Sequence, residues 1–156
     1  MITFTVTRDK KLIHTIVTDP DIWKKVTDDS VTDPNLFFIS LEPRFIWVLV
    51  KDDYEIMGLF LAEKRNHIMY EIHTMLLRAA YGNALHIAKE GLKWAFNNLL
   101  NCKRIITLVP SYNILADRLC RNTGLQFIGL NRGSYLYNGV MYDTKLYGIS
   151  KEELCQ

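Results

Sequence analysis

The chain has 156 residues, of which 49% are hydrophobic, and its formal net charge is +2 at pH 7. This length corresponds to one ordinary domain, and the apolar share is sufficient to fill one core. The basic residues are scattered, which argues against nucleic acid as the primary partner. No apolar run is long enough to cross a membrane, and the first residues lack the apolar stretch of a signal peptide.

The cysteines Cys102, Cys120 and Cys155 are odd in number and far apart in the sequence. Because no CxxC pair is present, they predict neither a zinc site nor a disulfide framework. Unpaired cysteines are typical of a reducing compartment. We therefore expect a cytoplasmic protein without a bound metal.

The first half of the chain predicts a strand, two helices and then three more strands. Apolar and polar residues alternate over residues 1–7, which indicates a strand, and Leu12–Val17 indicates a short helix. Asp19 and Pro20 suit the cap and first position of a second helix, and the polar residues 27–34 indicate a loop. The three later strands are expected at Phe45–Val50, Glu55–Glu63 and Ile68–Leu77, as an antiparallel meander.

The second half begins with a long helix. Leu85, Ala88, Leu92 and Ala95 recur at helical spacing and predict a helix from residues 82–84 to residue 101. The elements expected after it are a strand at Arg104–Val109, a helix at Ile114–Thr123 ended by Gly124, and strands at Phe127–Tyr137 and Val140–Ile149 around an Asn138-Gly139 turn. This order predicts one mixed α/β domain over residues 1–156, with a single mixed sheet.

The segment 78–84 lies between a predicted strand and the long helix. A loop in this position directs backbone N–H groups outward at the positive end of a helix dipole, which suits a pyrophosphate. Its small residues would allow phosphates to approach the backbone. A plain strand-to-helix turn, in which Gly82 serves only the local geometry, explains the same pattern.

A second motif begins where the strand ending at Val109 gives way to a helix. Asn113 stands at this junction and suits a helix cap. It equally suits an amide presented to a ligand at the end of the strand.

Together the two motifs resemble the GNAT superfamily of N-acetyltransferases. The phosphate loop of that family reads Gln/Arg-x-x-Gly-x-Gly/Ala, which Ala79, Gly82 and Ala84 match except at the first position. Its later signature, Asn-x-x-Ala-x-x-Leu-Tyr-x-x-x-Gly-Phe, has its counterparts in Asn113, Ala116, Leu119, Cys120, Gly124 and Leu125. Ile56-Met57-Gly58 and the Asn138-Gly139 hairpin agree with the family pattern, so the resemblance covers roughly residues 45–154. The C-terminal sequence looks most like that of phage-encoded members.

The resemblance implies transfer of acetyl from acetyl-CoA to an amine by direct attack in a ternary complex. The pantetheine arm would lie between the strands 68–77 and 104–109, which splay apart in this family. A backbone N–H of the strand before the loop would stabilise the tetrahedral oxyanion. The residues expected to bind CoA are Met75, Leu76, Leu77, Arg78, Ala79, Ala80, Tyr81, Gly82, Asn83, Ala84, Asn113 and Ala116.

The expected catalytic residues are Glu71, His73 and Cys120. Glu71 and His73 are two positions apart on a strand and therefore share a face, where either suits the general base. The same pair also suits an ordinary solvated strand face. Cys120 stands where the family has a Tyr that protonates the leaving thiolate, and it suits either a proton donor or a small core residue. Tyr112, Tyr135 or water are the other candidate donors.

The N-terminal half of this family shapes the acceptor pocket. The candidates here are Trp23, Asp28, Asp29, Phe37 and Phe38. Asp28 and Asp29 suit either attraction of a cationic amine or a solvated helix end. The sequence is compatible with a protein or a small molecule as the acceptor, with acetyl or a longer acyl group, and with a monomer or a homodimer.

Two departures from the family, at Ala79 and Cys120, support a second hypothesis. Because fold alone does not prove function, a catalytically silent GNAT-fold protein fits the same motifs. Such a protein would be a binding or structural component, for example of a virion, or a host-directed factor.

Overall fold

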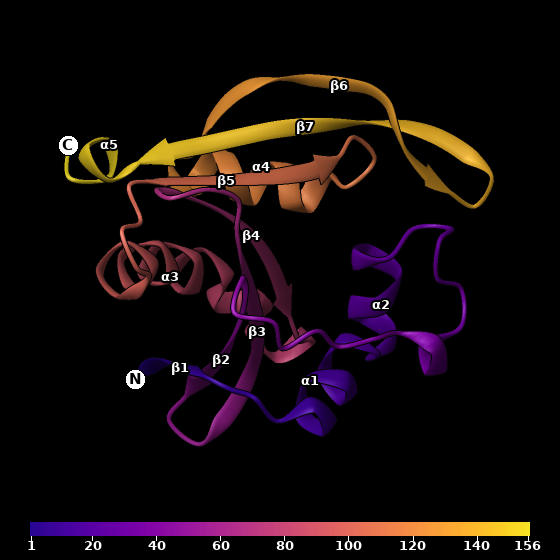
Figure 1. The fold of residues 1–156 in the computed structure, drawn as a ribbon, viewed down its shortest axis with the longest axis horizontal. Helices are drawn as coiled ribbons and strands as arrows, with labels where there is room; N and C mark the ends of the chain where they lie inside the picture. Colours follow the sequence, from indigo (N-terminus) through magenta and orange to yellow (C-terminus); the bar gives the residue numbers. More distant parts are fainter.

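One seven-stranded sheet, in the order β1-β2-β3-β4-β5-β7-β6, organises the structure, a computed structural model that describes residues 1–156 (Figure 1). Its strands are β1 (Ile2–Val6), β2 (Phe45–Asp52), β3 (Glu55–Lys64), β4 (Met69–Leu76), β5 (Arg104–Pro110), β6 (Gln126–Tyr137) and β7 (Val140–Ser150). All neighbours are antiparallel except β4 and β5, which are parallel. The predicted mixed α/β class and the meander of β2, β3 and β4 are confirmed.

The helices are α1 (Lys10–Val17), α2 (Pro20–Val26), α3 (Ala84–Asn98), α4 (Ile114–Thr123) and α5 (Lys151–Leu154), with short 3-10 turns η1 (Pro34–Leu36) and η2 (Arg78–Asn83). Asp19 caps α2 as predicted, since its carboxylate accepts the N–H of Asp21 at 2.9 Å. Gly124 ends α4 in the left-handed conformation, with φ of 101°. None of the helices combines the length and apolar character needed to cross a lipid bilayer.

The helix α3 differs from its prediction at both ends of its apolar pattern. It ends at Asn98 rather than at residue 101, because Leu99 adopts an extended conformation and buries its side chain. Leu85, expected on the buried side, is exposed in the first turn. The buried stripe instead includes Ile87 and Gly91. An added Cβ at Gly91 would lie 2.2 Å from the ring of Phe60 on β3, so this glycine allows the ring to pack against the helix.

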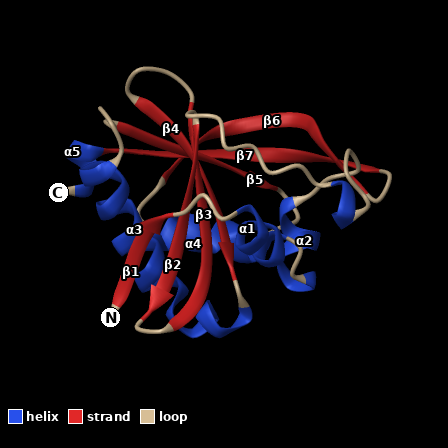
Figure 2. Ribbon diagram, turned by 60° about the horizontal axis from the view of Figure 1, so that its bottom comes forward, coloured by secondary structure: helices blue, strands red, loops and turns tan.

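Two layers of helices cover opposite faces of the sheet. Met75 of β4 and Leu59 of β3 pack with α1 and α2, whereas Tyr70 of β4 packs with α3. Side chains alternate between faces along a strand, so Glu71, His73 and Met75 share the α1/α2 face. The sheet is strongly twisted, and its strands fan out in Figure 2, where the β6–β7 hairpin projects beyond β5.

The end of β4 lies unusually close to the backbone of β3 at Gly58. Gly58 has φ of +147°, and a Cβ added there would lie 2.1 Å from the carbonyl oxygen of Met75. A register shift between Val50 and Lys51 bends the β2–β3 pair near this point. Only glycine satisfies both the backbone conformation and the contact. Gly58 therefore fixes the end of β4 that leads into η2.

We expect Gly58→Ala to lower the free energy of unfolding by about 3 kcal/mol, because it adds both backbone strain and a clash with the Met75 carbonyl. Urea denaturation measures this loss. Gly82→Ala is the matched control, because no atom lies within 4 Å of a Cβ at Gly82. Its unfolding free energy should stay within about 0.5 kcal/mol of the wild type. Equal losses in both variants would contradict the argument.

Candidate functional site

The parallel strands β4 and β5 separate soon after they begin. Only three residue pairs join them, from Met69 with Arg104 to Glu71 with Ile106. Beyond this point β4 continues to Leu76 and β5 to Pro110 without pairing to each other. The result is a V-shaped opening within the sheet, which the sequence predicted only through the family resemblance.

The backbone of β4 offers hydrogen bonds to this opening at alternate residues. The Leu77 N–H donates to the Met57 carbonyl at 2.9 Å, and the Met75 carbonyl faces Gly58, so both residues are directed at β3. Consecutive residues of a strand point their backbone groups in opposite directions, so Leu76 faces the opening. Of the three residues of this strand that were expected to bind CoA, Leu76 therefore presents its backbone groups to the opening, whereas those of Met75 and Leu77 are directed at β3.

The loop η2 and the start of α3 lie at the end of the β4 arm. Neither has a side-chain cap, and neither carries an acidic residue in its first turn. Gly82 does not have a positive φ, and a Cβ there would meet no protein atom within 4 Å. Local geometry therefore does not require this glycine, which weakens the interpretation as a plain turn. The small residue instead keeps the space above the loop open.

Two side chains that were not among the expected CoA-binding residues border this loop. The Lys25 amino group of α2 lies 2.5 Å from the Tyr81 hydroxyl and 4.7 Å from the centre of its ring. Leu85 leaves an apolar side chain exposed in the first turn of α3. No sequence motif marks Lys25, since its proximity to Tyr81 depends on how α2 packs.

On the other arm, Asn113 caps α4. Its side-chain oxygen accepts the Ala116 N–H at 3.1 Å, which confirms the capping interpretation. The next two residues, Ile114 and Leu115, are exposed apolar side chains at the end of β5. The first turns of α3 and α4 thus both present apolar surface close to the opening.

Cys120 lies on the opposite face from Glu71 and His73, packed against the core cluster that contains Phe96 and Leu125. Burial, helped by the nearby Asp117 carboxylate, raises the pKa of the Cys120 thiol to about 12. The thiol is therefore neutral and a weak acid, as expected of a packing residue. The three residues predicted to be catalytic do not form one cluster.

Glu71 and His73 do come together, in a charge cluster at the narrow end of the opening. Glu71 lies directly opposite Glu63 across the β3–β4 ladder, an arrangement that is destabilising for two like charges. Arg65 lies between them, with guanidinium nitrogens 3.0 Å from Glu63 Oε1 and 2.8 Å from Glu71 Oε2. His73 Nε2 lies 3.4 Å from Glu71 Oε1.

Glu71 and His73 differ in their access to solvent. The Glu71 side chain is 4% exposed and that of His73 39% exposed, so only the imidazole is accessible. Burial lowers the pKa of His73 below its usual 6.5, aided by Arg65 and opposed by Glu71 and Glu63. At neutral pH the imidazole is therefore uncharged and able to accept a proton.

The same cluster has the spacing of a metal site. Ligand atoms of Glu63, Glu71 and His73 all lie within 4.8 Å of one another. However, the Arg65 guanidinium already supplies the positive charge between the two carboxylates. A metal ion would have to displace it, so the arrangement fits an internal ion pair better than a metal centre.

The acceptor candidates Asp28 and Asp29 have different surroundings. The Asp29 carboxylate accepts the N–H groups of Asn138 at 2.8 Å and Gly139 at 2.9 Å. It therefore holds the β6–β7 turn and is not available for an amine, which corrects the prediction. Asp28 does not contact the hairpin turn: its carboxylate accepts from Ser30, and the residue lines a pocket.

The tyrosines proposed as proton donors pack together beside this turn. The Tyr112 ring stacks on Tyr137 at 5.2 Å between centres and contacts Tyr142 at 4.6 Å. The Tyr135 hydroxyl donates to the Thr27 carbonyl at 2.9 Å. Burial raises the pKa of both Tyr112 and Tyr135, so neither is a ready acid.

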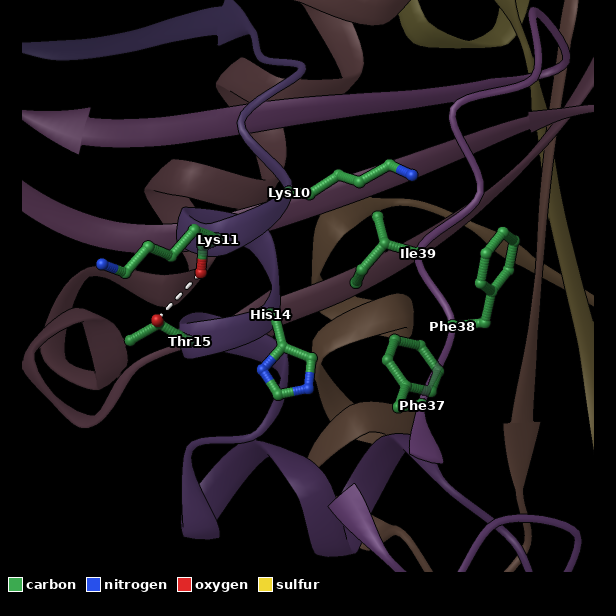
Figure 3. A pocket seen from close by; sticks show the side chains of 7 residues that line it. All are labelled: Lys10, Lys11, His14, Thr15, Phe37, Phe38 and Ile39. Atoms are coloured by element: carbon green, nitrogen blue, oxygen red, sulfur yellow. Dashed lines mark hydrogen bonds between the residues drawn. The ribbon is translucent and has the colours of Figure 1, made fainter. Parts of the chain in front are cut away.

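A second hollow, of about 530 Å³, lies between α1 and the segment after η1 (Figure 3). Phe37 and His14 border it, and His14 Nε2 lies 3.1 Å from the Pro34 carbonyl oxygen. Phe38 is 78% exposed here, with the Lys10 amino group 5.5 Å from its ring centre. Phe38 thus lies on the outer side of the molecule, away from the pocket that Phe37 shares with Asp28.

A protein-family model described as "Protein of unknown function (DUF2824)" matches residues 26–156. The chain belongs to this family. No curated protein matches it. Among solved structures, the spermidine N-acetyltransferase of Vibrio cholerae in complex with CoA and spermine has 18% identity and a TM-score of 0.80, over 99% of this chain and 98% of that chain.

A probable acetyltransferase of the GNAT family from Chromobacterium violaceum has 19% identity and a TM-score of 0.77, over 99% of this chain and 85% of that one. At such low identity the likeness concerns the fold. This DUF2824 chain therefore has the GNAT acetyltransferase fold, as the motifs predicted.

The lowered pKa of His73 predicts how stability depends on pH. Near pH 6 the unfolded chain binds more protons at this residue than the folded chain does, so the unfolding free energy falls as pH drops below about 6.5. We expect His73→Asn to lose less stability than the wild type between pH 7.5 and 5.5 in urea titrations. His67→Asn, in the exposed β3–β4 turn, is the control and should follow the wild type. Parallel curves for all three proteins would refute the prediction.

Proposed function

We propose that this chain is an acyl-CoA-dependent N-acyltransferase that transfers acetyl from acetyl-CoA to an amine. The observation that carries the proposal is the opening between β4 and β5, with the uncapped loop η2 at the end of one arm. Of the two solved structures named above, one is a spermidine N-acetyltransferase in complex with CoA and the other a probable acetyltransferase of the GNAT family. The three unpaired cysteines suit a reducing, cytoplasmic location.

The proposed CoA site follows the β4 arm. The pyrophosphate would rest on Arg78–Ala84, where the N–H groups of η2 and the start of α3 attract negative charge. Lys25 and Arg78 would add positive charge beside it. The pantetheine would continue along Met75–Leu77 towards the narrow end of the opening, opposite Asn113 and Ala116.

The thioester would lie beside the outward-facing backbone of Leu76. An N–H directed at the thioester oxygen stabilises the negative charge that develops when the amine attacks. Such a donor is worth roughly 3 kcal/mol of barrier in acyl transfer. Because this donor is a backbone group, variants that displace β4, such as Gly58→Ala, would remove it more effectively than any change at Leu76.

His73 is the proposed general base, and Glu71 and Arg65 orient it. The accessible imidazole takes a proton from the incoming ammonium, after which the nitrogen lone pair attacks the thioester carbon. The C–N bond forms, the C–S bond breaks, and the electron pair leaves on the CoA sulfur. As the nitrogen becomes an amide it loses its second proton, and water relays a proton to this thiolate, since an ordinary thiol has a pKa of about 8.5. Cys120 is too weak an acid to be favoured for that step.

Calorimetric titration with acetyl-CoA tests the cofactor site. We expect one-to-one binding that Gly82→Glu weakens at least about 100-fold, because the carboxylate would occupy the phosphate position and repel it. Gly82→Ala should weaken it far less. Absence of binding by the wild type at millimolar ligand would refute the proposal and favour the catalytically silent alternative.

Steady-state kinetics tests the base. We expect His73→Asn to lower kcat by about 10²- to 10⁴-fold with acetyl-CoA affinity unchanged, since proton removal is lost and the CoA site is intact. Glu71→Gln should reduce kcat less, because the imidazole remains present. If His73→Asn retained full turnover, the assignment of His73 would be wrong. A larger loss in Glu71→Gln than in His73→Asn would make Glu71 the base.

A further inference from the structure

A pocket of about 240 Å³ lies beneath the loop that follows α2. Its walls include the aliphatic side chains of Val26 and Val31 and the rings of Phe37 and Tyr135, and Asp28 is the one charged residue that lines it. At about 30 Å³ for a water-sized group, the pocket has room for about eight such groups. One carboxylate with two aromatic rings is a combination that favours an organic cation.

Ser30 holds the Asp28 carboxylate in place, and one of the two carboxylate oxygens receives no hydrogen bond. The Ser30 N–H at 2.9 Å and the Ser30 hydroxyl at 2.5 Å both donate to Oδ1 of Asp28. The other oxygen, Oδ2, has no donor in the structure. A partly buried carboxylate with an unused oxygen makes a strong, charge-assisted bond to an ammonium group.

The segment that builds this pocket connects both arms of the opening. Lys25, at the end of α2, contacts Tyr81 beside the β4 arm. Thr27 and Asp29 are bonded to the β6–β7 hairpin, whose strand β7 pairs with β5. Figure 1 shows α2 between β4 and the projecting hairpin. The pocket therefore lies at the wide end of the opening, on the face that carries His73.

Asp28 and His73 belong to two different charge clusters. The ionisable groups that face His73 are Glu71 on its own strand, Glu63 on β3 and Arg65 in the turn, whereas Asp28 faces Tyr112 and Tyr135. A carboxylate that held the reacting nitrogen would also stabilise its protonated form, which cannot attack. Asp28 is therefore suited to a second cationic group, one that does not react.

We infer that the acceptor is an aliphatic amine with a second cationic group and that Asp28 is the residue that selects it. This inference rests on the proposed function, since it assigns the substrate class of the same site. The second cation binds Asp28, and the alkyl chain lies against Phe37 and Tyr135. The first nitrogen then reaches the thioester and His73. Diamines and longer polyamines have this chemistry, whereas monoamines do not.

Three acceptors of equal chain length test the proposed class of substrate. They are 1,4-diaminobutane, butylamine and 4-aminobutanoate, whose second ends are positive, uncharged and negative. With release of the CoA thiol as the readout, we expect kcat/KM for the diamine to exceed that for butylamine by about 10- to 100-fold, as for one charge-assisted contact. Equal values for diamine and monoamine, or a preference for 4-aminobutanoate, would overturn the inference.

The substitution Asp28→Asn tests whether Asp28 binds the second cationic group. It keeps the oxygen that Ser30 bonds but removes the charge, so the loop should stay in place. We expect it to raise KM for 1,4-diaminobutane about 10- to 100-fold, whereas KM for butylamine should stay within about twofold of the wild-type value. Asp33→Asn is the matched control, because Asp33 caps η1 through the Asn35 N–H and does not line the pocket. An undiminished preference for the diamine in Asp28→Asn would overturn the assignment.

Direct binding separates this inference from the proposed function. Calorimetric titration of the protein with 1,4-diaminobutane, with and without CoA, needs no turnover. Binding that Asp28→Asn weakens at least tenfold supports the pocket even if acetyl-CoA fails to bind and the proposed function falls. Diamine binding that is absent from the wild type, or unchanged in Asp28→Asn, overturns the inference while acetyl-CoA binding still stands.

Discussion

Beyond Glu71 and Ile106 the facing edges of β4 and β5 no longer supply each other with hydrogen-bond partners. Backbone N–H and C=O groups inside a sheet are almost always paired, so two open edges within one sheet need water or a ligand. The chain places the uncapped starts of η2 and α3 at the end of the β4 edge, and it exposes apolar side chains at the ends of both edges, at Leu85 and Ile114. An extended ligand with amide groups and a phosphate end satisfies all these requirements together.

Two separated arms keep a fixed distance only if other segments connect them. The segment from Lys25 to Asp29 does so on one face, through Tyr81 at one end and the Asn138-Gly139 turn at the other. On the opposite face α3 packs against α4. The opening is therefore enclosed by connections on both faces, and the pocket lined by Asp28 is part of one of these connections. The proposed acceptor site and the rigidity of the opening consequently depend on the same loop.

A cluster of charged side chains surrounds His73 at the narrow end of the opening. Glu63 and Glu71 oppose each other across the ladder, and Arg65 compensates both, so a single negative charge remains while His73 is neutral. A proton taken up by His73 would leave the cluster neutral, which lowers the cost of forming an imidazolium there. The same balance explains why Glu71, although nearly sealed from solvent, is tolerated as a charged residue.

Local patterns in the sequence determined the order of the elements, the caps of α2 and α4 and the stop at Gly124. Each depends on residues within a few positions of one another, which is why the prediction succeeded. The tertiary structure alone decided that Arg65 pairs Glu63 with Glu71, that Asp29 binds the hairpin turn while Asp28 lines a pocket, and that Cys120 lies on the other face from His73. These relations join residues whose proximity depends on how the sheet twists and where α2 packs, and no local propensity carries that information.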